Sequence, residues 1–202
     1  MAKVLVGVPC METLPVEFVQ SVTKLRGDYD LHFEPLSLVY VAREAIVDRA
    51  ILGKYDYVLF IDSDMVFTGS LLNDLLRAKK DIVTGLAFMR KPPFSPCVYT
   101  SVKLGETPEE KQIEFLKDFD TPREVDGCGL ACCLIRTEVF RKIREKDRLV
   151  FWPFFGYGED LTFCLRARKA GFKIYADPRV RVGHIGKDII LEDHFRRWQD
   201  GK

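Results

Sequence analysis

Apolar runs alternate with amphipathic segments along the first ninety residues. Four runs rich in Val, Leu, Ile and Phe predict buried strands, at residues 3–10, 30–38, 55–62 and 81–89. Apolar residues at helical spacing predict helices between them, at 16–26, 41–54 and 70–80. Gly53 is expected to cap the second helix at its C-terminus, and Ser70 to cap the third at its N-terminus.

The second half of the chain begins with an irregular segment, and predicted strands and helices follow it. Residues 91–125 are rich in proline and charge, which indicates a variable excursion with a short hairpin over the site. A glycine-interrupted strand then follows at 125–136, and helices are expected at 137–145 and 161–171. One or two strands are predicted within 172–186.

This order predicts an α/β protein with a central, mostly parallel sheet flanked by helices. At 202 residues with 47% hydrophobic content, the chain is expected to form one domain. We divide it into a nucleotide-binding half (1–90), an acceptor and catalytic half (91–190) and a C-terminal tail (191–202).

Charge and cysteine content narrow the functional classes. Lys plus Arg total 31 and Asp plus Glu total 30, so we expect no nucleic-acid binding through a global positive field. The six cysteines lack the paired spacing of a zinc site, and Cys128, Cys132 and Cys133 are expected to be buried thiols. The short apolar run at the N-terminus stops at Pro9, which favours a cytoplasmic protein without a membrane span.

The third predicted strand ends in Asp62-Ser63-Asp64. Ligands of open α/β sheets collect beyond the carboxyl ends of the strands, where these residues are expected. In a continuing strand the two aspartates face one way and Ser63 turns aside. Paired carboxylates suit a hard cation such as Mn²⁺ or Mg²⁺ that also binds phosphate, although a polar turn that caps the next helix gives the same three residues.

Several motifs in order resemble the GT-A glycosyltransferases, particularly the family 2-like enzymes. VLFIDSDMVF is similar to their DxD strand and VDGCGLACCLIRTEVF to their glycine-containing strand and helix. FGYGEDLTFCLRARKAGFKIYADPRVRVGHIG is similar to their Glu-Asp helix and downstream histidine. The resemblance extends from about residue 4 to 186, and it implies the GT-A fold and sugar transfer from a nucleotide-diphosphate donor, most commonly a UDP-sugar.

The resemblance also implies roles for individual residues. Asp64 is similar to the direct metal ligand, Asp62 to the residue that touches the ribose or the metal's water shell, and His184 to a further metal contact. From the residue alone, a loop histidine bonded to backbone is the favoured reading of His184, and His32 and His194 are taken as structural.

Glu159 and Asp160 are the candidate catalytic pair. At a helix N-terminus the backbone dipole favours their ionised forms, which predicts a base that is ready at neutral pH. In the family, the aspartate of such a pair deprotonates the acceptor hydroxyl, which implies inversion by Asp160. Helix capping alone explains the same pair, and retention of stereochemistry stays open.

The other candidates surround the donor. By resemblance, the backbone of Val8 and Pro9 lies against the base, Glu34 and Arg43 or Arg49 contact base and diphosphate, and Ser63 lies beside the donor. Four aromatic residues just before the catalytic pair suggest a wall for a carbohydrate or other hydroxyl acceptor, namely Trp152, Phe154, Phe155 and Tyr157.

Two other functions remain open. A nucleotidyltransferase shares the layered fold, but GVPCMETLP lacks the glycine-rich basic loop expected after the first strand. A carbohydrate-binding module that keeps the fold without turnover is the non-enzymatic alternative.

Overall fold

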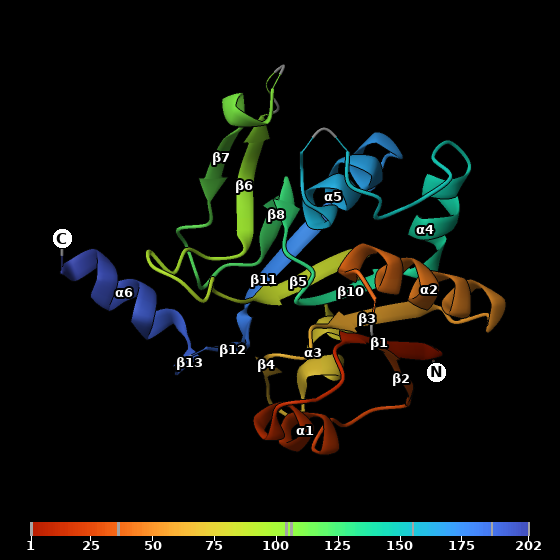
Figure 1. Ribbon diagram of the computed structural model, residues 1–202, viewed down its shortest axis with the longest axis horizontal. Helices are drawn as coiled ribbons and strands as arrows, with labels where there is room; N and C mark the ends of the chain where they lie inside the picture. The colour runs from red at the N-terminus through yellow and green to blue at the C-terminus, as the bar shows by residue number, and fades with distance from the viewer. Residues whose placement is uncertain are drawn as a thin grey trace.

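The computed structural model describes residues 2–35, 37–103, 105, 107–154, 156–186 and 188–201. Its centre is a seven-stranded sheet (Figure 1). In spatial order the strands are β2 (Tyr29–Pro35), β1 (Val4–Cys10), β3 (Tyr57–Ile61), β10 (Cys132–Arg136), β5 (Ile82–Leu86), β11 (Ile174–Arg181) and β8 (Arg123–Val125).

The sheet is mixed, which corrects the expectation of a mostly parallel one. The pairs β2–β1, β1–β3 and β5–β11 are parallel, whereas β3–β10, β10–β5 and β11–β8 are antiparallel. The four strands predicted in the first ninety residues are confirmed, in the predicted order along the chain, as β1, β2, β3 and β5. The strands β10 and β8 follow the excursion after β5 and run against the others, so β10 separates β3 from β5.

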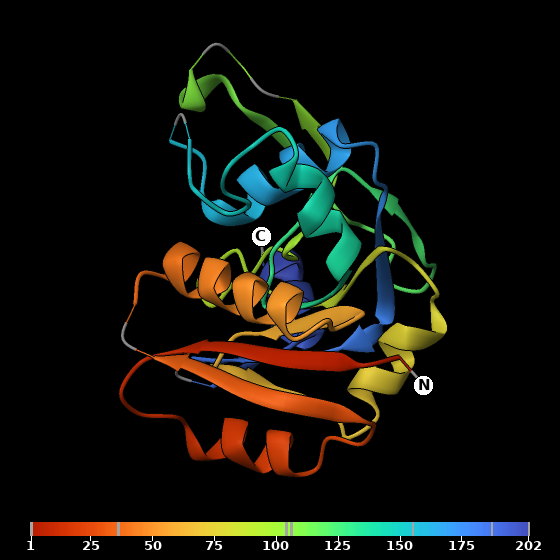
Figure 2. The same cartoon turned by 90° about the vertical axis from the view of Figure 1, so that its right-hand side faces the viewer.

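Helices cover both faces of the sheet, as the alternation predicts. α1 (Val16–Thr23) and α3 (Leu71–Arg77) pack on one face, and α2 (Val39–Leu52), α4 (Thr137–Arg144) and α5 (Glu159–Lys169) pack on the other. Figure 2 shows α1 and α2 on opposite sides of β1. None of the helices in these described ranges is both long and apolar enough to cross a bilayer.

Side-chain alternation along β1 accounts for the two apolar layers. Val4, Val6 and Val8 pack toward α1 and α3, whereas Leu5 packs in the layer with α2. Gly7 belongs to the α2 side, where an added Cβ would lie 2.4 Å from Ile46 Cγ2. The glycine therefore lets α2 approach the sheet closely.

Both predicted helix caps are confirmed, since Gly53 is the C-cap of α2 and Ser70 the N-cap of α3, although Gly53 is not left-handed and Ser70 makes no side-chain cap. Gly53 follows α2 with φ −76°, and the left-handed residue is Lys54 with φ 54°. An added Cβ on Gly53 would lie 2.5 Å from the Tyr55 ring, so space is what requires glycine here. Ser70 precedes α3 without a side-chain cap, because its hydroxyl pairs with that of Thr68 at 3.1 Å.

Two three-stranded sheets extend the core. The predicted hairpin within 91–125 is confirmed as β6 (Val98–Lys103) and β7 (Gln112–Phe115), and β9 (Gly127–Cys128) pairs with β6. A short 3-10 turn, η1 (Pro108–Glu110), lies in this hairpin. The second small sheet joins β4 (Met65–Val66), β12 (Gly183–Ile185) and β13 (Ile189–Ile190).

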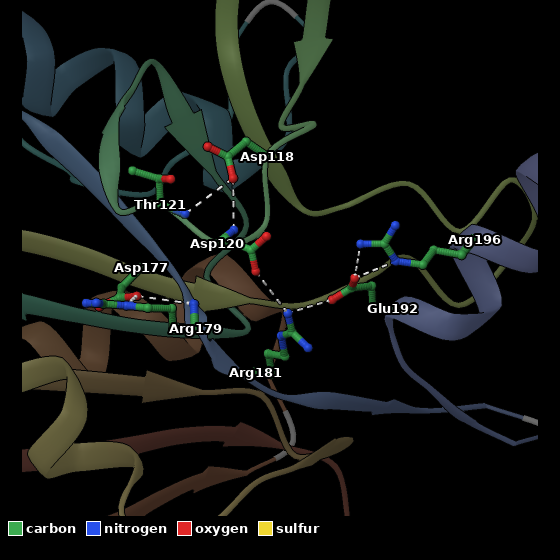
Figure 3. Close-up of polar contacts among 8 residues, drawn as sticks. All are labelled: Asp118, Asp120, Thr121, Asp177, Arg179, Arg181, Glu192 and Arg196. Carbon is green, nitrogen blue, oxygen red and sulfur yellow. Dashed lines mark hydrogen bonds and ion pairs between the residues drawn. The ribbon is translucent and has the colours of Figure 1, made fainter.

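The expected C-terminal tail is instead a helix, α6 (Glu192–Asp200). Phe195 packs on Phe88 and Phe119, with ring centroids 5.9 and 5.8 Å apart. Arg181 of β11 lies between Glu192, at 3.0 Å, and Asp120, at 3.8 Å (Figure 3). The helix is thus tied to the main sheet by aromatic packing and ion pairs, which short-range sequence patterns do not reveal.

The cysteine prediction is confirmed. Cys128, Cys132 and Cys133 are buried free thiols, and so is Cys164. Burial raises the pKa of the Cys132 thiol to about 12, which makes it unreactive.

Candidate active site

The Asp-Ser-Asp segment is a turn at the end of β3. β3 stops at Ile61, and the amide of Met65 donates to the carbonyl of Asp62 at 3.2 Å, which closes the turn before β4. The alternation of a strand therefore does not apply: Asp62 and Asp64 line one hollow, but so does Ser63, which was expected to turn aside, and the two carboxylates have different partners. Asp62 bonds Arg43, whereas Asp64 bonds His184.

Strand pairing brings Asp64 and His184 together across 120 positions of sequence. β4 pairs antiparallel with β12, with Met65 opposite His184, and the amide of Ile185 donates to the carbonyl of Asp64 at 2.8 Å. His184 Nε2 then lies 3.2 Å from Asp64 Oδ2. His184 Nδ1 lies 2.9 Å from the Phe88 carbonyl, which confirms the reading of a histidine bonded to backbone, while its role as a metal contact stays a prediction.

The Asp64–His184 pair requires a positive charge. A carbonyl only accepts, so Nδ1 carries the proton that bonds Phe88, and a neutral ring turns the bare Nε2 lone pair toward a carboxylate. Burial acts to lower the pKa of His184, but the hydrogen bonds to Asp64 and Phe88 outweigh it and raise that pKa. Burial likewise opposes the lowered pKa of Asp64, which His184 and Arg90 produce.

The same geometry fits a divalent metal. Two ligands at right angles, each about 2.1 Å from an ion, lie about 3.0 Å apart, close to the 3.2 Å between these atoms. In the described part of the chain, no three His, Cys, Asp or Glu side chains gather into a metal site. Asp64 and His184 would therefore hold a cation with the help of water and phosphate oxygens, as Mg²⁺ usually is held.

Arg43 joins the aspartate turn to the predicted catalytic pair. Its side chain is 2% exposed, and its Nη2 lies 2.9 Å from Asp62 Oδ1 and 3.9 Å from Asp160 Oδ1. Its Nε lies 3.8 Å from Glu159 Oε1. Asp62, Glu159 and Asp160 thus meet at one guanidinium, which is not free to bind a diphosphate as expected.

The electrostatics of Asp160 differ from the prediction. Glu159 and Asp160 do lie in the first turn of α5, after Gly158 at the N-cap position. Burial raises the pKa of Asp160 to about 8; Arg43 acts to lower it, and the charges of Glu159 and Asp62 add to the increase. Burial thus opposes the helix dipole and disfavours the ionised form that the sequence predicts at neutral pH.

A hollow of about 190 Å³ adjoins the aspartate turn. The candidates Pro9, Asp62, Ser63 and Asp64 line it together with Cys10, Met11, Ser37 and Val39. It lies where β1 and β3 end and α2 begins, the carboxyl edge of the parallel strands. A ligand in it would touch both the Asp-Ser-Asp turn and the loop after β1.

Three predicted donor residues do not line this hollow. The side chain of Val8 is fully buried in the layer with α1, and the prediction for its backbone stays a prediction. Arg49 is in the last turn of α2, near the amino edge of the sheet, where Lys3 Nζ bonds the carbonyl of Gly53. Glu34 bonds His32 at 2.9 Å and lines the same groove as Arg49, which does not include the aspartate turn.

Some contacts of the site were not predicted from the sequence. Arg90 Nη1 lies 3.1 Å from Asp64 Oδ2. One indication of this contact in the sequence is that Arg90 closely follows β5, at the same edge of the sheet. An added Cβ on Gly129 would lie 3.6 Å from Asp160 Oδ2 and 3.2 Å from Cys97 Cβ. The tight contact would be with Cys97, whereas the carboxyl of Asp160 would stay at an ordinary contact distance. His194 accepts from the amide of Leu191 at 3.3 Å, which confirms its structural role.

The aromatic cluster divides into core and surface. Tyr157 is buried with Leu161 and Val102, whereas Trp152 and Phe154 are 48% and 39% exposed. Phe155 lies outside the described residues. The Trp152 ring packs edge-on against Tyr40 at 5.0 Å, in the first turn of α2.

Arg166 holds this surface segment in place. It donates to the carbonyls of Val150 and Trp152 at 3.0 and 2.9 Å, and its guanidinium lies 5.6 Å from the centroid of the Phe154 ring. Trp152 is therefore an exposed ring on a fixed backbone, which suits recognition better than a mobile loop does.

Comparison with known proteins identifies the fold only. No family model and no curated protein matches the chain. Among solved structures, the chain is similar to A197 from STIV, with a TM-score of 0.64 and 20% identity, over 92% of this chain and 86% of A197. The two proteins thus share an overall fold.

Proposed function

We propose that this protein is a metal-dependent glycosyltransferase of the GT-A type that transfers a sugar from a nucleotide-diphosphate donor to an acceptor hydroxyl. The observation that carries the proposal is the pairing of Asp64 with His184 beside a hollow at the carboxyl edge of the sheet. Asp160 joins the same site through Arg43.

The donor side would be held by the aspartate turn. Asp64 and His184 would hold Mn²⁺ or Mg²⁺, which, when bound, offsets the charge that develops on the leaving diphosphate. Arg90, 55% exposed at its side chain, is free to turn from Asp64 to a phosphate oxygen. Pro9 and Ser63 line the space for the nucleoside, for which a UDP-sugar is the favoured candidate.

The acceptor side would centre on Asp160. Its Oδ1 is buried against Arg43, while 34% of the side chain is open to solvent and accessible to a hydroxyl. In its ionised form it accepts the proton of the attacking hydroxyl, which gives inversion in one step. Glu159 also faces the guanidinium of Arg43, which keeps Glu159 and Asp160 in one orientation.

A donor screen tests this function directly. UDP-, GDP-, CMP- and dTDP-sugars are added with and without Mn²⁺, and the melting temperature and nucleotide release are measured. One nucleotide class is expected to raise the melting temperature only with Mn²⁺, since a ligand at about 100 times its Kd stabilises by about 2.7 kcal/mol. Stabilisation without release from any donor supports the carbohydrate-binding alternative, and no stabilisation contradicts the proposal.

Trp152 is expected to stack on a sugar acceptor. Trp152→Ala should raise the KM for a carbohydrate acceptor about fivefold to tenfold, equivalent to ~1 kcal/mol of lost aromatic contact, with donor affinity unchanged. Trp198, 38% exposed on α6, provides the matched control as Trp198→Ala. An unchanged acceptor KM in the Trp152 variant would remove this residue from the acceptor wall.

A further inference from the structure

Arg43 is a fully buried cation in the middle of an α/β core. It is 1% exposed, and its guanidinium carbon lies 5.5 Å from the centroid of the Phe60 ring. Its Nη1 also donates to the Leu130 carbonyl at 3.4 Å. An arginine seldom lies this deep unless its charge is paired, so its partners explain its position.

Those partners come from two distant segments, and three carboxyl groups share the single guanidinium of Arg43. Asp62 belongs to the turn after β3, and Glu159 and Asp160 belong to the first turn of α5. One guanidinium faces three carboxyl groups, at 2.9, 3.8 and 3.9 Å. Removing the cation would leave these groups to repel one another across a poorly solvated space.

We propose that Arg43 is a positioning residue that fixes the donor-side Asp62 against the acceptor-side Glu159 and Asp160, and thereby sets the separation between bound donor and attacking hydroxyl. This inference rests on the proposed function for its catalytic meaning. The physical link between the two segments stands on geometry alone.

The fork of the guanidinium explains why arginine occupies this position. Nη2 faces both Asp62 and Asp160, Nε faces Glu159 and Nη1 faces Leu130. The ammonium of lysine keeps the charge but is a single point on a flexible stem. Lysine at this position would therefore retain much of the neutralisation and lose the fixed separation.

A stability cycle tests the link without any assay of activity. Arg43→Met is expected to lower the melting temperature by about 10 °C, the cost typical of one unpaired buried partner. Adding Asp160→Asn should restore at least half of that loss, beyond any stabilisation that Asp160→Asn gives in the wild type, because one repelling carboxyl group is removed. Arg141→Met, an exposed arginine on α4 paired with Glu138, should change the melting temperature by less than about 2 °C. Strictly additive effects of the Arg43 and Asp160 substitutions would show that Arg43 only fills space and would overturn the proposal.

A kinetic split tests the catalytic part. Arg43→Lys is expected to fold, to keep the Kd of the donor within threefold, and to lower kcat about 100-fold, since a misplaced catalytic group costs that much. An unchanged kcat would overturn the positioning role. If the wild-type protein turns over no donor, the proposed function fails, while the stability cycle still reports on the link.

Discussion

Asp64→Ala should abolish Mn²⁺-dependent binding of the nucleotide. Asp64 is one of two protein groups that face the proposed cation site, and among the described residues its loss leaves the His184 ring bonded to the Phe88 carbonyl. Changing a group that merely orients a metal ligand weakens metal binding 10–100-fold, so loss of a ligand should cost at least about 100-fold. Calorimetric titration of UDP with and without Mn²⁺ measures the effect.

The matched control is Asp74→Ala. Asp74 is an aspartate on α3 that pairs with Arg77, at a groove on another part of the surface. The Asp74→Ala variant should bind the nucleotide as the wild type does. Equal affinity of the Asp64 variant and the wild type in the presence of Mn²⁺ would show that the aspartate turn does not hold the cation.

Asp160→Asn is expected to lower kcat about 1,000-fold while the Kd of the nucleotide with Mn²⁺ stays within threefold. Asparagine keeps the shape of the side chain but cannot accept the proton of the hydroxyl, and general base catalysis contributes about 10²–10⁴-fold. The same variant should be more stable than the wild type at pH 7.5, by about 1 kcal/mol. The expected gain in the free energy of unfolding is kept this small because 34% of the side chain is exposed and solvent screens its charge.

The pH dependence follows from the raised pKa of Asp160. The ionised form is the base, so kcat/KM should rise with pH up to about 8 and level off above it. The folded pKa lies above that of an unfolded aspartate, so this group's contribution to stability is present at low pH and is lost as pH rises toward 8. A flat rate profile between pH 6 and 9 in the wild type would argue against Asp160 as the base.

The fold was largely predictable because local patterns control it. The continuous apolar run of β1 and the helical spacing of apolar residues in α2 reflect burial against elements close by in sequence. The direction of β10 and the helix α6 were not predictable in this way. Both depend on contacts across the chain, such as β10 between β3 and β5 and Phe195 on Phe88.

The site was predictable as a set of residues but not as a set of pairs. The sequence motifs select Asp62, Asp64, Asp160 and His184, and the structure places them around the end of β3. Their partners depend on the tight turn after Ile61, which separates the two aspartates. The burial that raises the pKa of Asp160 comes from segments far apart in sequence. A prediction made from the N-terminus of one helix does not include that burial.

The most direct test of the cation site is pulsed electron paramagnetic resonance of the protein with Mn²⁺ and UDP. Coordination by His184 predicts a ¹⁴N coupling to the manganese in the wild type, and its disappearance in His184→Ala. The account is contradicted if Mn²⁺ binds the wild-type protein with UDP and shows no nitrogen coupling, or if that coupling persists unchanged without His184.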